Sequence, residues 1–292
     1  GNALFTIDEQ GGIAGKSFLL PDGSKIDGNG LGAMFHPSPF SQIDVLATMG
    51  QSNACGGIPT IPAVSNTQPY NNLMPAYTTP GSPGAGVAGT GPHSFTPLLA
   101  PLSRQEWSGI AAANQVSRMI LRDSNMVAEQ LRTAIYSFNS AAQGSSIPYL
   151  GTDGTAVNFK RDLLFGYNEA TRLGLSYNVK AVIFSQGEAN ASMPASEYLA
   201  KEIQMYQWMN DFAKTTTGQA NDIKLLTWQL HELGGPRVAQ LIAADRHPNI
   251  HVCFPSDACT HTVGDGENLN AIGMALSGAY YGVAYQRLIV DA

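Results

Sequence analysis

The residues best suited to chemistry lie directly after an apolar segment near the start of the chain. Residues 43–49 are apolar and of strand length, and Gly50-Gln51-Ser52-Asn53 follows them. A serine hydroxyl in such a turn can attack an acyl carbon while neighbouring backbone N–H groups stabilise the oxyanion. The Gln51 and Asn53 amides can hydrogen-bond the turn or a substrate. An ordinary strand end has the same pattern, so the rest of the chain has to decide between the two interpretations.

Three further polar turns follow apolar segments or precede the last helical segment. They are Gln143-Gly144-Ser145-Ser146-Ile147, the stretch from Ser185 to Asn190, and residues 265–273. In an α/β protein, ligands bind at the carboxyl ends of parallel strands. The four turns are therefore expected to meet at one edge of a sheet.

Alternating apolar strands and amphipathic helices must position these turns. The predicted strands are residues 43–49, 133–138, 179–185, 223–229 and 250–254, and the predicted helices are residues 106–121, 159–175, 195–214, 237–244 and 271–288. Short apolar strands separated by helices imply a parallel sheet covered on both faces. With right-handed crossovers, this predicts a three-layer α/β/α doubly wound domain with a five-stranded parallel sheet.

Two segments do not fit the alternation. Residues 1–42 are punctuated by Gly, Asp and Pro and are expected to form an N-terminal extension or arm, which leaves residues 43–292 as the main domain. Residues 56–101 are rich in Pro, Gly, Ser and Thr and are expected to be a long loop insert. That insert either forms one wall of a ligand groove or serves a structural purpose only.

Composition excludes some classes of function. The chain of 292 residues carries only 13% charged residues and a net charge of −6, without a Lys/Arg cluster, which argues against nucleic acid as a partner. No apolar run reaches transmembrane length, so no membrane partner is expected. Low charge with many small polar residues suits an extracellular or virion-associated protein. A homo-oligomer is an option, as a trimer if the chain belongs to a phage adhesin.

The four turns in this order resemble the SGNH hydrolase superfamily, in particular its sialate O-acetylesterase-like carbohydrate esterases. The resemblance covers about residues 43–288 and implies a flavodoxin-like fold. It implies that Ser52 is the nucleophile and that its own N–H lies in the oxyanion hole. Gly144 would supply a second N–H, Gln186 would hold the oxyanion or the acyl oxygen, and Asp265 would be the catalytic acid.

The same resemblance implies a substrate and a set of supporting residues. The substrate would be an O-acetylated carbohydrate, namely sialic acid, hemicellulose or a bacterial surface polysaccharide, and no cofactor or metal is required. Gly187 and Glu188 would shape the third turn. Candidates for substrate binding are Gln51, Asn53, Glu188, Asn190 and His231, with Arg237 a further sugar contact. Each has an ordinary alternative: Asn190 as a helix cap, His231 as a satisfied histidine and Arg237 as a solvated charge.

One position departs from the family pattern. The family carries Asp-x-x-His in its last block, whereas Asn268 stands three residues after Asp265 here. An asparagine keeps hydrogen bonds but cannot take the serine proton and pass it on. Three explanations remain open: Asn268 replaces the histidine by engineering, His261 is the base in a natural rearrangement, or the chain is a catalytically dead carbohydrate-binding module.

The three cysteines predict neither a disulfide framework nor a complete metal site. Cys253 and Cys259 could close a short loop, or join His261 at a zinc ion, but paired ligand spacing is missing. Free or buried thiols are the expectation.

Overall fold

The chain forms two compact units, Gly1–Pro39 and Phe40–Ala292. The computed structural model describes residues 6–7, 13–14, 18–19, 25–26, 40–56, 65, 67–77, 92–100, 106–151, 154–262 and 266–291. In the first unit, β1 (Thr6–Ile7) pairs antiparallel with β2 (Ile13–Ala14), and β3 (Phe18–Leu19) pairs with β4 (Lys25–Ile26). The predicted extension of residues 1–42 ends three residues later than this unit does.

The second unit is built on a sheet whose five parallel strands are the predicted ones. These are β5 (Gln42–Gly50), β8 (Thr133–Tyr136), β9 (Ser176–Ser185), β10 (Lys224–Gln229) and β11 (Ile250–Pro255). Their spatial order is β11-β10-β9-β5-β8, so the chain runs outward in both directions from β5. This is the doubly wound order of flavodoxin-like domains, whose ligand crevice lies where the winding reverses. The predicted α/β fold is confirmed.

The sheet also contains two strands that the sequence did not predict. β6 (Leu73–Tyr77) and β7 (Pro92–Pro97) come from the segment 56–101 and pair antiparallel at the edge beyond β8. β6 joins β8 through the pair Leu73–Tyr136. The prolines that bound β7 are tolerated because β7 is the edge strand, and Pro75 lies in the part of β6 beyond its single pair with β8. Interpreting the whole of this segment as a loop was therefore wrong: it extends the sheet to seven strands.

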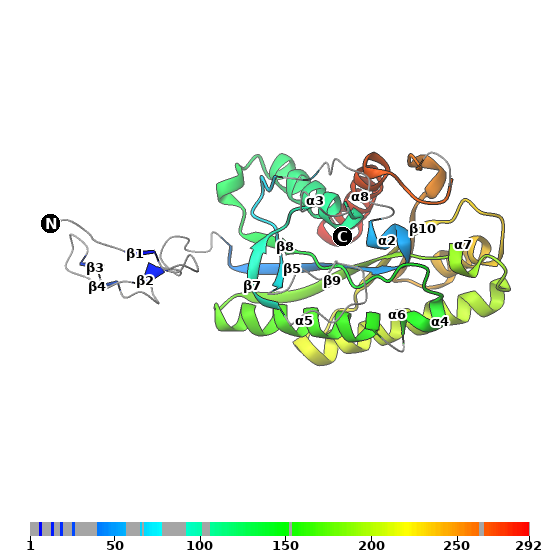
Figure 1. The fold of residues 1–292 in the computed structure, drawn as a ribbon, viewed down its shortest axis with the longest axis horizontal. Coiled ribbons are helices and arrows are strands. Elements are labelled where there is room, and N and C mark those ends of the chain that lie inside the picture. The colour runs from blue at the N-terminus through cyan, green and yellow to red at the C-terminus, as the bar shows by residue number, and fades with distance from the viewer. Residues whose placement is uncertain are drawn as a thin grey trace. The chain divides into compact units, whose positions relative to one another are not determined.

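Helices cover both faces of the sheet (Figure 1). α3 (Ser108–Ser124) and α8 (Ala271–Tyr285) lie on one face, and α5 (Gly154–Arg172) and α6 (Ala195–Thr217) lie on the other. α7 (Gly235–Arg246) packs beside α6. The short elements are α2 (Ser52–Cys55), α4 (Ile147–Leu150), the 3-10 turns η1 (Ala128–Gln130), η2 (Glu188–Asn190) and η3 (Ser256–Ala258), and the π turn η4 (Gln286–Val290). Within the described residues, no helix is both long and apolar enough to cross a bilayer.

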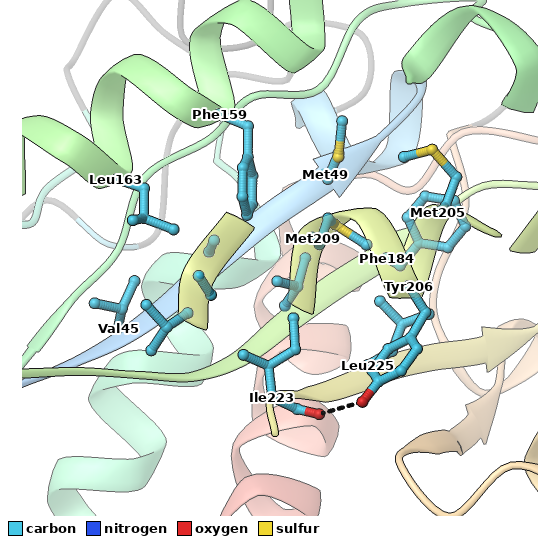
Figure 2. Close-up of a cluster of buried hydrophobic side chains, with 14 of the residues drawn as sticks. Val45, Met49, Phe159, Leu163, Phe184, Met205, Tyr206, Met209, Ile223 and Leu225 are labelled. Carbon is cyan, nitrogen blue, oxygen red and sulfur yellow. Dashed lines mark hydrogen bonds between the residues drawn. The ribbon is translucent and has the colours of Figure 1, made fainter. Parts of the chain in front are cut away.

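Strand β5 contributes to the core on both of its faces. Val45 and Met49 point to the face covered by α5 and α6, whereas Leu46 points to the α3 and α8 face. All three side chains are fully buried, as the period of two along a strand requires when helices cover both sides. Figure 2 shows Val45, Met49 and Phe159 in the first of these clusters. At about 25 cal/mol per Å² of apolar surface, this burial is the main force that holds β5 in the centre of the sheet.

Candidate active site

Strand β5 ends at a glycine that no other residue could replace without a shift in the structure. Gly50 has φ +140°, and a Cβ there would lie 2.0 Å from the backbone oxygen of Ser185 at the end of β9. The next residue continues this contact, because the Gln51 N–H donates to Ser185 O at 3.0 Å. The close approach of the two strand ends places Ser52 at the point where the winding of the sheet reverses.

Ser52 is the first residue of α2, with Gln51 as the N-cap. Its side chain is half-buried, and no described residue hydrogen-bonds its hydroxyl. As a first-turn residue it also has an N–H without an acceptor inside the helix. A hydroxyl and a backbone donor are therefore available at the same residue.

The turn that contains Gly144 lies beside the Ser52 turn because the chain after β8 continues along β5. The Ser140 N–H donates to Thr48 O at 2.9 Å, and the Ala142 N–H donates to Gly50 O at 3.0 Å. Two residues later, Gly144 adopts φ +68°, and the space where its Cβ would lie is open. Asn139, which the sequence did not single out, ties this segment to α2 by donating from Nδ2 to Ala54 O at 2.8 Å.

Gln186 lies fully buried directly after β9. Its Nε2 has three protein acceptors for two hydrogens: Asn190 Oδ1 at 2.6 Å, Gln51 Oε1 at 3.3 Å and Ser145 O at 3.3 Å. Its Oε1 accepts a 2.6 Å hydrogen bond from the Tyr198 hydroxyl on α6. In this arrangement the amide braces three turns against one another, so donating to an oxyanion would require it to give up one of these acceptors.

Asn190 lies inside the protein rather than on an open surface. It is buried, and its Oδ1 accepts from Gln186 Nε2 and, at 2.9 Å, from the Ile147 N–H at the start of α4. Gln51 is also buried, and its Oε1 accepts from the Ala189 N–H at 2.9 Å as well as from Gln186. These two predicted substrate contacts therefore hold the second and third turns to the serine turn.

Asn53 joins the serine turn to the last polar segment. Its Nδ2 donates to Glu188 Oε1 at 2.6 Å and to Glu267 O at 3.1 Å, while its Oδ1 accepts from the Leu269 N–H at 2.8 Å. Glu188 follows Gly187, whose φ of +149° turns the chain sharply after Gln186. Burial raises the pKa of Glu188 to about 7, and the negative charges of Glu232 and Glu267 add to this.

The structure brings the two predicted histidines together at one end of the sheet. The ring centroids of His231 and His261 lie 5.2 Å apart. The backbone N–H of His231 donates to Ser256 Oγ at 2.9 Å, and Arg237 donates from Nη1 to the backbone oxygen of His231 at 2.8 Å. Arg237 is thus tied to the turn after β10 rather than being only a solvated charge.

The last polar segment folds back on the chain before it. His261 forms an antiparallel bridge with Leu269, and the Thr262 N–H donates to Asn268 O at 2.6 Å. Asn268 is half-buried. Asp265, the predicted acid, lies outside the described residues. The acid's distances to Ser52 and Asn268 therefore stay a prediction.

The described part of the chain contains no cluster of side chains suited to bind a metal ion. No group of three His, Cys, Asp or Glu side chains there could hold a metal ion. Cys55, Cys253 and Cys259 are not in disulfides, and burial raises the pKa of Cys55 and Cys259 to about 12. Such thiols are poor nucleophiles and poor metal ligands at neutral pH.

A cavity of about 230 Å³ lies between α4 and α6. Trp208, Met205, Lys201 and Pro148 are among its lining residues, and none of its lining residues is a predicted site residue. Its wall is connected to the serine turn only indirectly, through Ile147 and Asn190. It is therefore a separate feature of the surface.

Comparison with known proteins supports the fold. No known family model matches the chain, and no curated protein sequence does. Among solved structures, a protein from Arabidopsis thaliana is 14% identical with a TM-score of 0.58, over 84% of this chain and 98% of that one. NanS is 12% identical with a TM-score of 0.51, over 86% and 96%. A carbohydrate acetylesterase from Xanthomonas citri is 16% identical with a TM-score of 0.50, over 85% of this chain and 57% of that longer one.

At these identities the likeness establishes a shared α/β/α fold. One of these structures is described as a carbohydrate acetylesterase, which is the class that the polar turns resemble. The activity of the present chain has to be argued from its own residues.

Proposed function

We propose that the chain is a serine esterase that removes O-acetyl groups from a carbohydrate. The observation that carries the proposal is the place of Ser52: its hydroxyl is free of described partners at the switch point of a doubly wound sheet. The turn of Gly144 runs alongside, and the Gln-Gly-Glu turn is bonded to the same strand end. The resemblance of the four turns to sialate O-acetylesterase-like enzymes supports the substrate class.

In the proposed reaction, the Ser52 oxygen attacks the acetyl carbonyl and its proton passes to a base oriented by Asp265. The N–H groups of Ser52 and Gly144 stabilise the oxyanion of the tetrahedral intermediate. Collapse of that intermediate releases the sugar alcohol, which takes up the proton, and leaves an acetyl ester on Ser52. Water then attacks this ester by the same route and frees acetate. Gln186 holds the turns in register, and its contribution to the oxyanion is part of the proposal.

The base is the weak point of this mechanism in the present chain. An asparagine side chain at 268 cannot accept a proton at neutral pH. Of the candidate bases, His261 lies in the segment paired with Leu269, next to position 268. We propose that the fold is built for a histidine at 268 and that any turnover by this chain depends on His261.

Acetate release separates these roles. We would compare the chain with Ser52→Ala and Asn268→His on 4-nitrophenyl acetate, O-acetylated xylan and O-acetylated sialic acid. Because general-base catalysis contributes about 10²–10⁴-fold, Asn268→His should raise the rate by a factor of this order, and Ser52→Ala in that background should remove the gain. No gain from Asn268→His together with no loss from Ser52→Ala would rule out the esterase.

A carbohydrate-binding module is the second candidate, and the asparagine at 268 is the observation that favours it. A pocket that keeps its backbone donors but lacks a base retains affinity without turnover. Calorimetry with the same two acetylated glycans would then give binding by the chain as it stands, with no acetate released by it or by Asn268→His.

A further inference from the structure

One buried side chain connects the nucleophile turn to the segment that carries position 268. Asn53 is almost fully buried, and its amide uses both hydrogens and its oxygen within the protein. Two of these three bonds go to the backbone of residues 267 and 269. The residue on either side of Asn268 is therefore held by the neighbour of Ser52.

The third bond of Asn53 ends on a carboxyl group with one unused oxygen. Glu188 Oε1 accepts from Asn53 at 2.6 Å, whereas Glu188 Oε2 is buried and has no partner among the described residues. Burial favours the protonated form, and it outweighs the hydrogen bonds from Asn53 and from the Glu188 backbone N–H, which lower the pKa. The carboxyl group is thus poised to exchange a proton while it holds Asn53.

The groups around Glu188 reinforce this preference. Glu232, after β10, and Glu267, in the last segment, raise the pKa of Glu188 by repulsion. Tyr198 on α6 and Tyr281 on α8 lie close enough to interact electrostatically with Glu188. Burial raises the pKa of each tyrosine well above 10, so both hydroxyls are neutral. The guanidinium of Arg237 on α7 donates to His231 O, and among the described residues no hydrogen bond or ion pair joins it to Glu188.

We propose that Asn53 and Glu188 form a proton-sensitive bracket that positions residues 267–269, and with them the side chain at 268, against Ser52. Both are positioning residues. Their catalytic meaning rests on the proposed esterase function, whereas the bracket itself does not. Opening that exposes the Glu188 carboxyl to water removes the burial that raises its pKa, so deprotonation of Glu188 favours such opening.

The size of the effect follows from the linkage. A pKa of about 7 in the closed bracket, against 4.5 for a free glutamate, predicts that the closed form loses about tenfold in stability relative to the open form between pH 6 and pH 8. The Leu269 N–H reports this opening directly, because its acceptor is Asn53 Oδ1.

Hydrogen–deuterium exchange of Leu269 tests the bracket without any substrate. After correction for the intrinsic exchange rate, protection in the unmodified chain should fall about tenfold from pH 6 to pH 8. Glu188→Gln should make protection independent of pH. The matched control Glu232→Gln removes a neighbouring charge outside the bracket, so it should keep the dependence with a lower midpoint.

Constant protection of Leu269 in the unmodified chain across this range overturns the proposal, whether or not Glu188→Gln folds. An unchanged pH dependence in a folded Glu188→Gln variant overturns it as well. The two proposals fail separately: a chain that releases no acetate, even with Asn268→His, refutes the esterase and leaves the exchange result standing. In an active variant, Glu188→Gln should lower kcat with little change in KM and flatten the pH profile near 7.

Discussion

The imidazole rings of His231 and His261 lie 5.2 Å apart, centroid to centroid, where β10 and β11 end. The two rings come from loops that are distant in sequence. His261 also forms a backbone bridge with Leu269, so its imidazole lies in the segment next to position 268. This arrangement makes these histidines the residues to test as a source of turnover when position 268 carries an amide.

We expect His261→Gln to lower the residual acetyl hydrolysis of the chain at least tenfold, because general-base catalysis contributes more than that. The same substitution in an Asn268→His background should change the rate by no more than about threefold, since the base then stands at 268. His231→Gln serves as the control for loss of the ring contact. Initial rates of 4-nitrophenyl acetate hydrolysis give all three values, and equal losses in both backgrounds would exclude His261 as a substitute base.

Gly50→Ala should destabilise the second unit by more than about 3 kcal/mol, because a Cβ would collide with Ser185 O at a positive φ. Gly174→Ala is a matched control: Gly174 also has a positive φ, +70°, but its Cβ would enter open space, so about 1–2 kcal/mol is expected. Urea denaturation compares the two variants. Equal losses would show that the close approach of β5 and β9 is not what excludes a side chain at Gly50.

Tyr198→Phe should loosen Gln186, because the Tyr198 hydroxyl is the donor to Gln186 Oε1. We expect a loss of about 1–2 kcal/mol in the free energy of unfolding and a severalfold loss of turnover in an active variant. Tyr206→Phe is the comparison on the same helix, since the Tyr206 hydroxyl contacts Ile223 O and Asn249 instead. Thermal denaturation with an activity assay distinguishes them, and a loss of activity shared by both variants would count against a role for Gln186.

Glu202→Gln should change how stability depends on pH. Glu202 is fully buried on α6, neither of its oxygens has a partner among the described residues, and burial raises its pKa to about 8. A raised carboxyl pKa means that the folded state holds the proton longer than the unfolded state, so stability falls as pH rises from about 4.5 to about 8. Glu202→Gln should therefore match the unmodified chain near pH 5 and exceed it by on the order of 3 kcal/mol near pH 8.

The control for that experiment is Glu197→Gln on the same helix. Glu197 is exposed and only 3.9 Å from Lys201, an ion pair of little energetic weight. Its replacement should leave the pH dependence of the urea midpoint unchanged. A flat profile for the unmodified chain between pH 5 and pH 8 would contradict the assignment of a protonated carboxyl at Glu202.

The parallel core of the sheet could be predicted because its strands are apolar on both faces. Val45 and Leu46, for example, are both fully buried although they point in opposite directions. The edge strand β7 and its neighbour β6 escaped prediction because strands at the margin of a sheet tolerate proline and need no continuous apolar run. Their segment therefore had the composition of a loop.

The sequence also predicted that the polar turns follow the strands and lie together, but it did not predict the direction of each side chain. Gln186 and Asn190 were expected to face a substrate, whereas their amides bond to each other inside the protein. Tyr198, which completes that network, gave no signal, because a tyrosine in an amphipathic helix normally indicates only a core position. Side-chain direction after a strand depends on backbone turns such as the one at Gly187, and periodicity does not determine these.

The order of strands has a consequence for how the site comes into being. Gln51 and Gln186 share a hydrogen bond although 135 positions separate them, because β9 docks against β5 only after α3, β8 and α5 have been passed. Contacts of such long range form late and slowly. During synthesis, Ser52 emerges long before the strand that positions its turn, so a nascent chain carries the hydroxyl without its surroundings. Any acyl-transfer chemistry would therefore appear only at the end of folding.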